Sequence, residues 1–204
     1  AFYTPREIVS YMCRESLRQY LYTALDASVT LKGSIDDLLD RSDSEWALAG
    51  TNSKRDSVAK EDRVRIMDAL REIRVLDPAV GSGAFPMGIL HKILSLFERL
   101  EPNFDSYETK LSILRNNIYG VDIDPTAIEI SRLRAWLSII VDIRDIKKIK
   151  PLPNLDFKFV CANSLIGLEK SHASFTTDEN LKPELIRIRD EYYATSSKIK
   201  KEKL

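Results

Sequence analysis

The sequence predicts an α/β fold in which a partial parallel sheet is flanked by helices. Three stretches have the apolar residues of buried strands, near positions 74–80, 118–123 and 157–162. The first two are each followed by an apolar helical pattern, at 84–100 and from 125 onward. Strands that alternate with helices are typical of parallel sheets, so we expect these three strands in the spatial order 3-2-1.

The composition sets limits on the function. The length of 204 residues suits one domain with a sizeable core, and 44% of the residues are apolar. Lysine and arginine number 31, as do aspartate and glutamate, so the net charge is zero. A self-sufficient nucleic-acid-binding protein usually has a basic excess, so any DNA contact must come from a local patch or from protein outside this chain. No run of 18 apolar residues occurs, and no membrane span is expected.

The two cysteines, Cys13 and Cys161, are far apart and lack the spacing of metal ligands. Both lie in apolar surroundings, which predicts reduced cysteines in the core of a cytoplasmic protein, with no metal site. The first residues do not resemble a signal peptide. Because the sequence starts at a motif and ends in a lysine-rich helical pattern, we expect it to be part of a longer protein.

A helix is predicted to begin near Pro5, followed by apolar residues at helical spacing up to Leu21. Thr4 and Glu7 have the Thr-x-x-Glu spacing of a capping box.

Residues 34–39 look like a short capped helix, whereas 40–62 is rich in serine and charged residues and contains Trp46 and Leu48 as its large apolar residues. We therefore interpret 32–63 as a polar insertion, in which 40–62 is an exposed, partly mobile connection that can contain helical turns. Its basic residues could contact a partner, although a solvated surface is the more common role.

The first strand ends at Asp77 and is followed by a loop with two glycines, Gly81 and Gly83. Glycines permit a sharp turn and a close approach of the backbone to a ligand. The third glycine of the dinucleotide fingerprint is replaced by Pro86, and the Gly-Lys-Ser/Thr of a phosphate-binding loop is absent. Asp77 would repel a pyrophosphate and attract an ammonium group. S-adenosylmethionine carries an ammonium, a sulfonium and no phosphate, so it is the predicted cofactor; a nicotinamide-dependent oxidoreductase is the disfavoured alternative.

The helical pattern at 84–100 is apolar nearly all round, which predicts a helix buried between the sheet and other elements. A second helical stretch is expected at 107–114.

The second strand ends at Asp122, and Asp124 with Pro125 is expected to cap and start the next helix. A carboxylate at the end of this strand can accept hydrogen bonds from both ribose hydroxyls, and Asp122 suits that role because Asp124 is occupied with the helix. The alternative is an acid that only caps the helix. Arg132 and Arg134 are predicted surface charges. The predicted buried face of this helix comprises Ile128, Leu133, Trp136, Leu137 and Ile140.

The third strand shows Phe157, Phe159 and Cys161 in alternation and leads to Asn163. The side-chain oxygen of Asn163 can accept a hydrogen bond from the adenine amino group of a cofactor. The alternative is an asparagine that forms a turn.

Several of these segments resemble the amino-group DNA methyltransferases, and in particular their adenine-N6 branch. Residues 2–5 (Phe-Tyr-Thr-Pro) resemble motif X, residues 77–85 (Asp-Pro-Ala-x-Gly-Ser-Gly-Ala-Phe) motif I, and residues 119–125 (Tyr-Gly-Val-Asp-Ile-Asp-Pro) motif II. Residues 151–166 resemble the long single-chain (type IIG) restriction–modification enzymes, in which methyltransferase and nuclease share one polypeptide. The resemblance covers about 2–22 and 74–168.

The resemblance implies transfer of a methyl group from S-adenosylmethionine to adenine N6 in double-stranded DNA. It implies that the methionine end of the cofactor lies at Tyr3, Thr4 and Pro5, its ammonium at Asp77, and its adenosyl part at Asp122, Ile123, Asn163 and Ser164. Pro78, Ala79, Gly81, Ser82, Gly83 and Ala84 complete the expected cofactor-binding set.

The Asn-Pro-Pro-Tyr/Phe motif that receives the target base in this family is absent from the sequence. No catalytic residue is therefore assigned, and we expect the chain alone to be inactive. The parent protein would supply the rest of the methyltransferase and the target-recognition domain.

We divide the sequence into a cofactor-binding part at 1–168 and a helical extension at 169–204, the start of an insertion ahead of the missing motif. Apolar residues from Leu181 to Ile199 predict an amphipathic helix in this extension. Two alternatives remain: a non-catalytic interaction or specificity module with a degenerate methyltransferase fold, and a methyltransferase that acts on RNA or protein.

Overall fold

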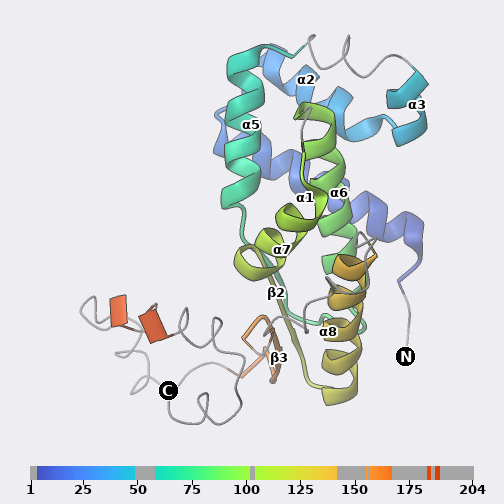
Figure 1. The fold of residues 1–204 in the computed structure, drawn as a ribbon, viewed down its shortest axis with the longest axis vertical. Helices are drawn as coiled ribbons and strands as arrows, with labels where there is room; N and C mark the ends of the chain where they lie inside the picture. Colours follow the sequence, from blue (N-terminus) through green and yellow to red (C-terminus); the bar gives the residue numbers. More distant parts are fainter. Residues whose placement is uncertain are drawn as a thin grey trace.

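The computed structural model describes residues 4–48, 58–101, 104–141, 155 and 157–166, with short helical pieces at 183–184 and 187–188. Its elements, shown in Figure 1, are α1 (Arg6–Ala24), α2 (Val29–Asp40), α3 (Asp43–Leu48), α5 (Lys60–Glu72), β1 (Val75–Asp77), α6 (Ala84–Leu100), α7 (Ser106–Asn116), β2 (Ile118–Asp122), α8 (Pro125–Ile140) and β3 (Phe159–Cys161). The helices α1, α2, α3, α5 and α6 form the upper part of the view, and the strands lie below them with α8 alongside.

The three strands form a parallel sheet in the order β1-β2-β3, as predicted. The register pairs Asp77 with Gly120 and Asp122 with Cys161, so the carboxyl ends of all three strands lie at one edge. The predicted α/β fold class is confirmed. In such sheets ligands bind outside the carboxyl ends of the strands.

A buried asparagine fixes the start of the sheet. Asn117 is 2% exposed, and its side-chain amide donates to the carbonyl oxygens of Arg71 and Ile73 at 2.8 and 2.7 Å. Its own carbonyl oxygen accepts a hydrogen bond from the amide of Val75 at 2.8 Å. These bonds join the end of α5 to the starts of β1 and β2, and they satisfy the side-chain amide of the buried Asn117.

The buried helix predicted at 84–100 is α6, and it contacts α1, α2, α5 and α7. Gly88 lets α1 approach closely, because an added Cβ would lie 2.7 Å from Val9 Cγ1 and 2.9 Å from Cys13 Sγ. Ten residues of α6 are buried, which makes this helix the centre of the core. The loop that precedes α6 is thereby attached to a rigid element.

The interpretation of 40–62 as an exposed connection is wrong near its start, where α3 brings Trp46 into the core. The helix predicted at 34–39 is longer, because α2 begins after Ser28, whose hydroxyl caps it by accepting from Leu31 N. Trp46 is only 4% exposed. The α2 residues that join the core are Leu31, Ile35, Leu38 and Leu39. Residues 49–57 lie outside the described part of the chain.

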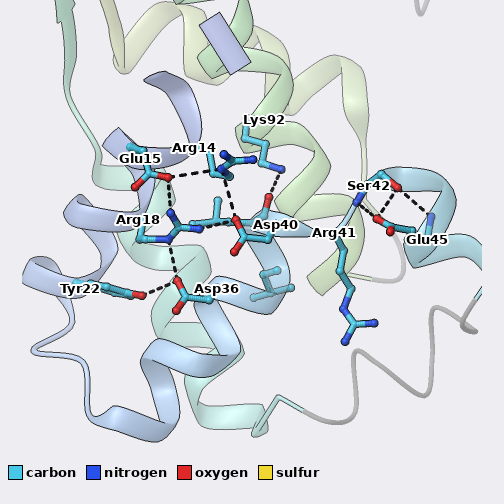
Figure 2. Close-up of polar contacts among 12 residues, drawn as sticks. Arg14, Glu15, Arg18, Tyr22, Asp36, Asp40, Arg41, Ser42, Glu45 and Lys92 are labelled. Atoms are coloured by element: carbon cyan, nitrogen blue, oxygen red, sulfur yellow. Dashed lines mark hydrogen bonds and ion pairs between the residues drawn. The ribbon is translucent and has the colours of Figure 1, made fainter. Parts of the chain in front are cut away.

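Polar residues on α1 and α2 face one another (Figure 2). Arg18 binds Asp36 at 2.8 Å and Asp40 at 2.5 Å, and it also pairs with Glu15. The Arg18 side chain is 15% exposed, so these ion pairs are better shielded than ordinary surface pairs. Ion pairs therefore connect α1 to α2.

Buried Arg99 ties α6 to the end of α2. Its guanidinium donates to the carbonyl oxygens of Leu38, at 2.5 Å, and Arg41, at 3.0 Å, and lies 5.1 Å from the ring centroid of Trp46. Unsatisfied carbonyl groups at a helix C-terminus are stabilised by a cation.

Three further predictions need correction. The capping box at Thr4 is wrong, because Pro5 is the N-cap of α1 and no side chain caps this helix. Leu133 and Leu137 are 50% and 44% exposed, so the buried face of α8 differs from the predicted one. Cys161 is exposed, not in the core. The buried residues of α8 are Ile128, Ser131, Ala135 and Ile139.

None of the helices within the described ranges is long and apolar enough to cross a membrane. The predicted extension at 169–204 and its amphipathic helix fall outside the described residues, apart from the two short helical pieces.

The two cysteines should differ in reactivity. Burial raises the pKa of the Cys13 thiol to about 12, whereas Cys161 is exposed. Because the thiolate is the reactive form, iodoacetamide at about pH 8 should modify Cys161 and spare Cys13, and both should react once the chain is unfolded. Mass spectrometry of digested protein measures this, and equal rates for the two folded-state thiols would contradict the structure.

Candidate functional site

The loops after the three strands meet at the carboxyl edge of the sheet. The hydroxyl of Ser164, after β3, donates to the carbonyl oxygen of Pro78, after β1, at 2.8 Å. The amide of Val80 donates to the carbonyl oxygen of Val121 at 2.9 Å. The edge therefore brings together the segments predicted as parts of one cofactor site.

The glycine loop turns as the sequence predicts. Gly81 and Gly83 have φ angles of +51° and +81°, which lie in the left-handed region that glycine adopts without steric cost. The amide of Gly83 donates to the carbonyl oxygen of Val80 at 2.9 Å, and Gly83 is the N-cap of α6. Strand, tight turn and helix thus follow one another within a few residues.

Asp122 binds this loop. Its Oδ2 accepts a hydrogen bond from the amide of Gly81 at 2.7 Å, and its Oδ1 accepts one from the amide of Asp124 at 2.9 Å. Asp124 in turn caps α8 by accepting from Thr126 N at 2.8 Å, as predicted. Each carboxylate oxygen can accept more than one bond, so Asp122 retains acceptor capacity for a ligand.

Asp77 lies at the end of the neighbouring strand, and its Oδ1 accepts from the amide of Ala79 at 3.1 Å. Burial is the main cause that raises the pKa of Asp77 above its usual value; the bond from Ala79 opposes the rise and the negative charge of Asp122 adds to it. A cation placed beside Asp77 would offset this unfavourable environment.

The remaining residues of the predicted cofactor site follow β3, follow Asp122 or precede α1. The side-chain oxygen of Asn163 accepts from the amide of Leu165 at 3.0 Å, which is the turn that the sequence left as an alternative. A second lone pair of this oxygen could still serve adenine. Ile123 is 70% exposed next to Asp122. Thr4 and Pro5 lie ahead of α1, and Tyr3 falls outside the described residues.

Sequence reasoning missed contacts of three residues of α8. Arg134 is exposed, as predicted, but it also donates to the carbonyl oxygen of Ser82 at 2.8 Å and to its hydroxyl at 3.2 Å. Arg132 is not the predicted surface charge, because its side chain is only 19% exposed and donates to the carbonyl oxygen of Phe159 at 2.7 Å. Ser131 is fully buried and donates to the carbonyl oxygen of Gly81 at 2.7 Å. A serine in the middle of an apolar helix is the sequence signal that could have drawn attention to this contact.

An open groove of about 660 Å³ lies between α1 and α6. Its lining includes Arg134 and two of the predicted cofactor residues, Thr4 and Ala84, whereas Asp122 and Asn163 are not among its lining residues. The predicted cofactor residues are therefore divided between the carboxyl edge and this groove. Within the described residues, no group of three or more histidine, cysteine or acidic side chains is arranged to hold a metal ion.

Residues 116–204 match the family described as Eco57I restriction-modification methylase. A putative type II restriction enzyme and methyltransferase of Methanocaldococcus jannaschii is 35% identical over 200 residues, which cover 89% of this chain and 15% of that protein. The adenine-specific methyltransferase PglX of Streptomyces coelicolor is 33% identical over 63 residues, 31% of this chain and 5% of that protein.

The chain thus spans a small part of the length of these relatives. The resemblance predicted from the motifs is confirmed: this chain is a relative of restriction–modification methyltransferases and carries, at 116–204, sequence of the Eco57I restriction-modification methylase family.

Proposed function

We propose that this chain is the S-adenosylmethionine-binding part of a DNA methyltransferase that modifies adenine N6 in a restriction–modification system. The carboxyl edge of the sheet carries this proposal, because it combines a glycine loop with Asp77 and Asp122 at the ends of adjacent strands. The description of the matching family and the name of the M. jannaschii relative support restriction–modification as the setting, and the S. coelicolor relative is called adenine-specific.

Each part of the edge suits one part of the cofactor. Asp77 offers negative charge to the ammonium, and Asp122 offers acceptors to the ribose hydroxyls. Ile123, exposed beside Asp122, offers an apolar surface to the adenine ring. Asn163 and Ser164 follow β3, where Ser164 binds the loop after β1, and we assign them to the edge of the adenine ring.

The bound cofactor would supply an electrophilic methyl group on its sulfonium. The residues described here would bind and orient it, and positioning of this kind can provide a large share of the rate of such a transfer. The parent protein would contribute the site for the target adenine and the contacts with double-stranded DNA, because the sequence contains no Asn-Pro-Pro.

Asp122 is proposed to bind the ribose, and it also holds the glycine loop. These two effects are separated by changing the ligand as well as the residue. In calorimetric titrations, the unmodified chain should bind S-adenosylhomocysteine one-to-one and bind its 2′-deoxy analogue roughly tenfold more weakly, because a hydrogen bond to a charged acceptor is lost. In Asp122→Asn the two ligands should bind with more nearly equal affinity, since the charged acceptor is already absent.

Asp124→Asn is the matched control, because asparagine also caps helices well and this residue is not assigned to the ligand. A folded chain that binds neither ligand would contradict the proposal and favour the non-catalytic module. The same 2′-deoxy penalty in both proteins would mean that Asp122 acts only through the loop. Methylation assays of the parent protein on DNA, RNA and protein then distinguish the acceptors.

The raised pKa of Asp77 predicts that cofactor affinity depends on pH. The ammonium favours the ionised carboxylate, whose pKa is raised, so affinity for S-adenosylmethionine should fall as the pH falls, beginning above the ordinary aspartate value of about 3.9. Titrations between about pH 7.5 and about pH 5 measure this, and Asp77→Asn should show a flatter profile.

The same raised pKa fixes the sign of the stability effect. The contribution of Asp77 to stability is present at low pH and is lost as the pH rises through the folded-state pKa. Asp77→Asn should therefore leave the free chain as stable at neutral pH, or more stable, while it weakens cofactor binding. A destabilised variant with unchanged affinity would show that Asp77 has only a structural role.

A further inference from the structure

We infer that Ser131 and Arg134 of α8 are positioning residues, which hold the glycine loop in its cofactor-binding shape by binding the backbone of Gly81 and Ser82. This inference rests on the proposed function, in which that loop receives S-adenosylmethionine. It adds two residues from a helix that the sequence assigns to packing and surface charge.

The peptide groups of Gly81 are held from two sides. Asp122 accepts the Gly81 amide at 2.7 Å, and the hydroxyl of Ser131 donates to the Gly81 carbonyl oxygen at 2.7 Å. Ser131 is fully buried, so water cannot readily replace its hydroxyl. Glycine samples more backbone conformations than other residues, and these two bonds restrict Gly81 to one of them.

Arg134 extends the contact by one residue. One nitrogen of its guanidinium donates to the Ser82 carbonyl oxygen at 2.8 Å and lies 3.2 Å from the Ser82 hydroxyl oxygen. Ser131 and Arg134 are three residues apart and therefore lie on one face of the helix. That face presents a buried hydroxyl and a cation to two successive carbonyl oxygens of the loop.

These contacts close a ring. Asp122 binds the loop through Gly81, the loop binds α8 through Ser131, and the first turn of α8 is capped by Asp124, whose amide donates back to Asp122. The position of the loop relative to the proposed ribose ligand is thereby set by β2 and α8 together. Ligand binding then costs less conformational entropy, because the loop is already held in place.

The fit between loop and helix is close. A Cβ added at Gly83 would lie 3.1 Å from Ser131 Oγ and 3.4 Å from Ser131 Cα. The hydroxyl therefore occupies a site with little spare room. Alanine is the suitable replacement for Ser131, because it removes the hydrogen bond without adding atoms.

A positioning role and a direct effect of charge predict different results. S-adenosylmethionine carries one more positive charge than S-adenosylhomocysteine. If Arg134 acts by positioning the loop, its removal weakens the binding of both ligands by the same factor. If its charge acts through space, its removal favours the cationic ligand over the neutral one.

The test is calorimetric titration of Ser131→Ala, Arg134→Met and Arg134→Lys with both ligands, alongside Arg115→Met, an exposed arginine of α7, as the matched control. Ser131→Ala and Arg134→Met should raise both dissociation constants about tenfold, and Arg115→Met should leave them unchanged. Arg134→Lys, which can donate but lacks the guanidinium geometry, should fall between Arg134→Met and the unmodified chain.

Amide hydrogen exchange without ligand supplies a second readout. The amides of Gly81 and Gly83 should exchange faster in Ser131→Ala and Arg134→Met, while the melting temperature of Arg134→Met stays within about 2 °C. Unchanged amide exchange and unchanged ligand affinity in both variants would overturn the inference. Weaker binding of only one of the two ligands would also overturn it. Failure of the unmodified chain to bind either ligand would instead overturn the proposed function.

Discussion

The hydrogen bond between the Gly81 amide and the Asp122 carboxylate is the interaction on which the candidate site depends. It joins the loop after β1 to the end of β2, two segments separated by 41 residues in the sequence. The parallel register makes it possible, because Asp77 pairs with Gly120 and Asp122 therefore extends two residues beyond the last residue of β1. One carboxylate thus positions the loop and remains available to a ligand.

The helices support the carboxyl edge of the sheet through α6. The loop leads directly into α6, whose buried faces contact α1, α2, α5 and α7. Asn117 fixes the starts of β1 and β2, and Arg99 fixes the end of α2 against α6. The end of the loop at Gly83 is therefore anchored on a packed core, which resists displacement, while Asp122, Ser131 and Arg134 hold Gly81 and Ser82.

The sequence predicted the elements whose signals are local. The strands, the glycine turn and the Asp124 cap each depend on a few neighbouring residues, and the structure has all of them. The ion pairs between α1 and α2 had no such local signal, because Arg18 binds acids on another helix that are 18 and 22 residues away. Charged residues look solvated until their partners are known.

The buried face of α8 was predicted wrongly for a similar reason. Leu133 and Leu137 were predicted to be buried because they are hydrophobic, whereas the helix buries the small residues Ser131 and Ala135, and Ser131 lies close to Gly83. Arg134 is a surface charge, as predicted, but the sequence did not reveal its hydrogen bond, because the partner is a backbone carbonyl oxygen, which has no sequence signature. Such contacts become visible only once the strands have been paired in space.

The claim that the carboxyl edge of the sheet is the cofactor site is tested most directly by nuclear magnetic resonance of the ¹⁵N-labelled chain during titration with S-adenosylhomocysteine. The account predicts that the largest shifts of amide resonances occur at Gly81, Asp122, Ile123 and Asn163. Shifts confined to the groove between α1 and α6, at Ser10, Gly88 and Ser95, would contradict it and would place the ligand elsewhere on the molecule.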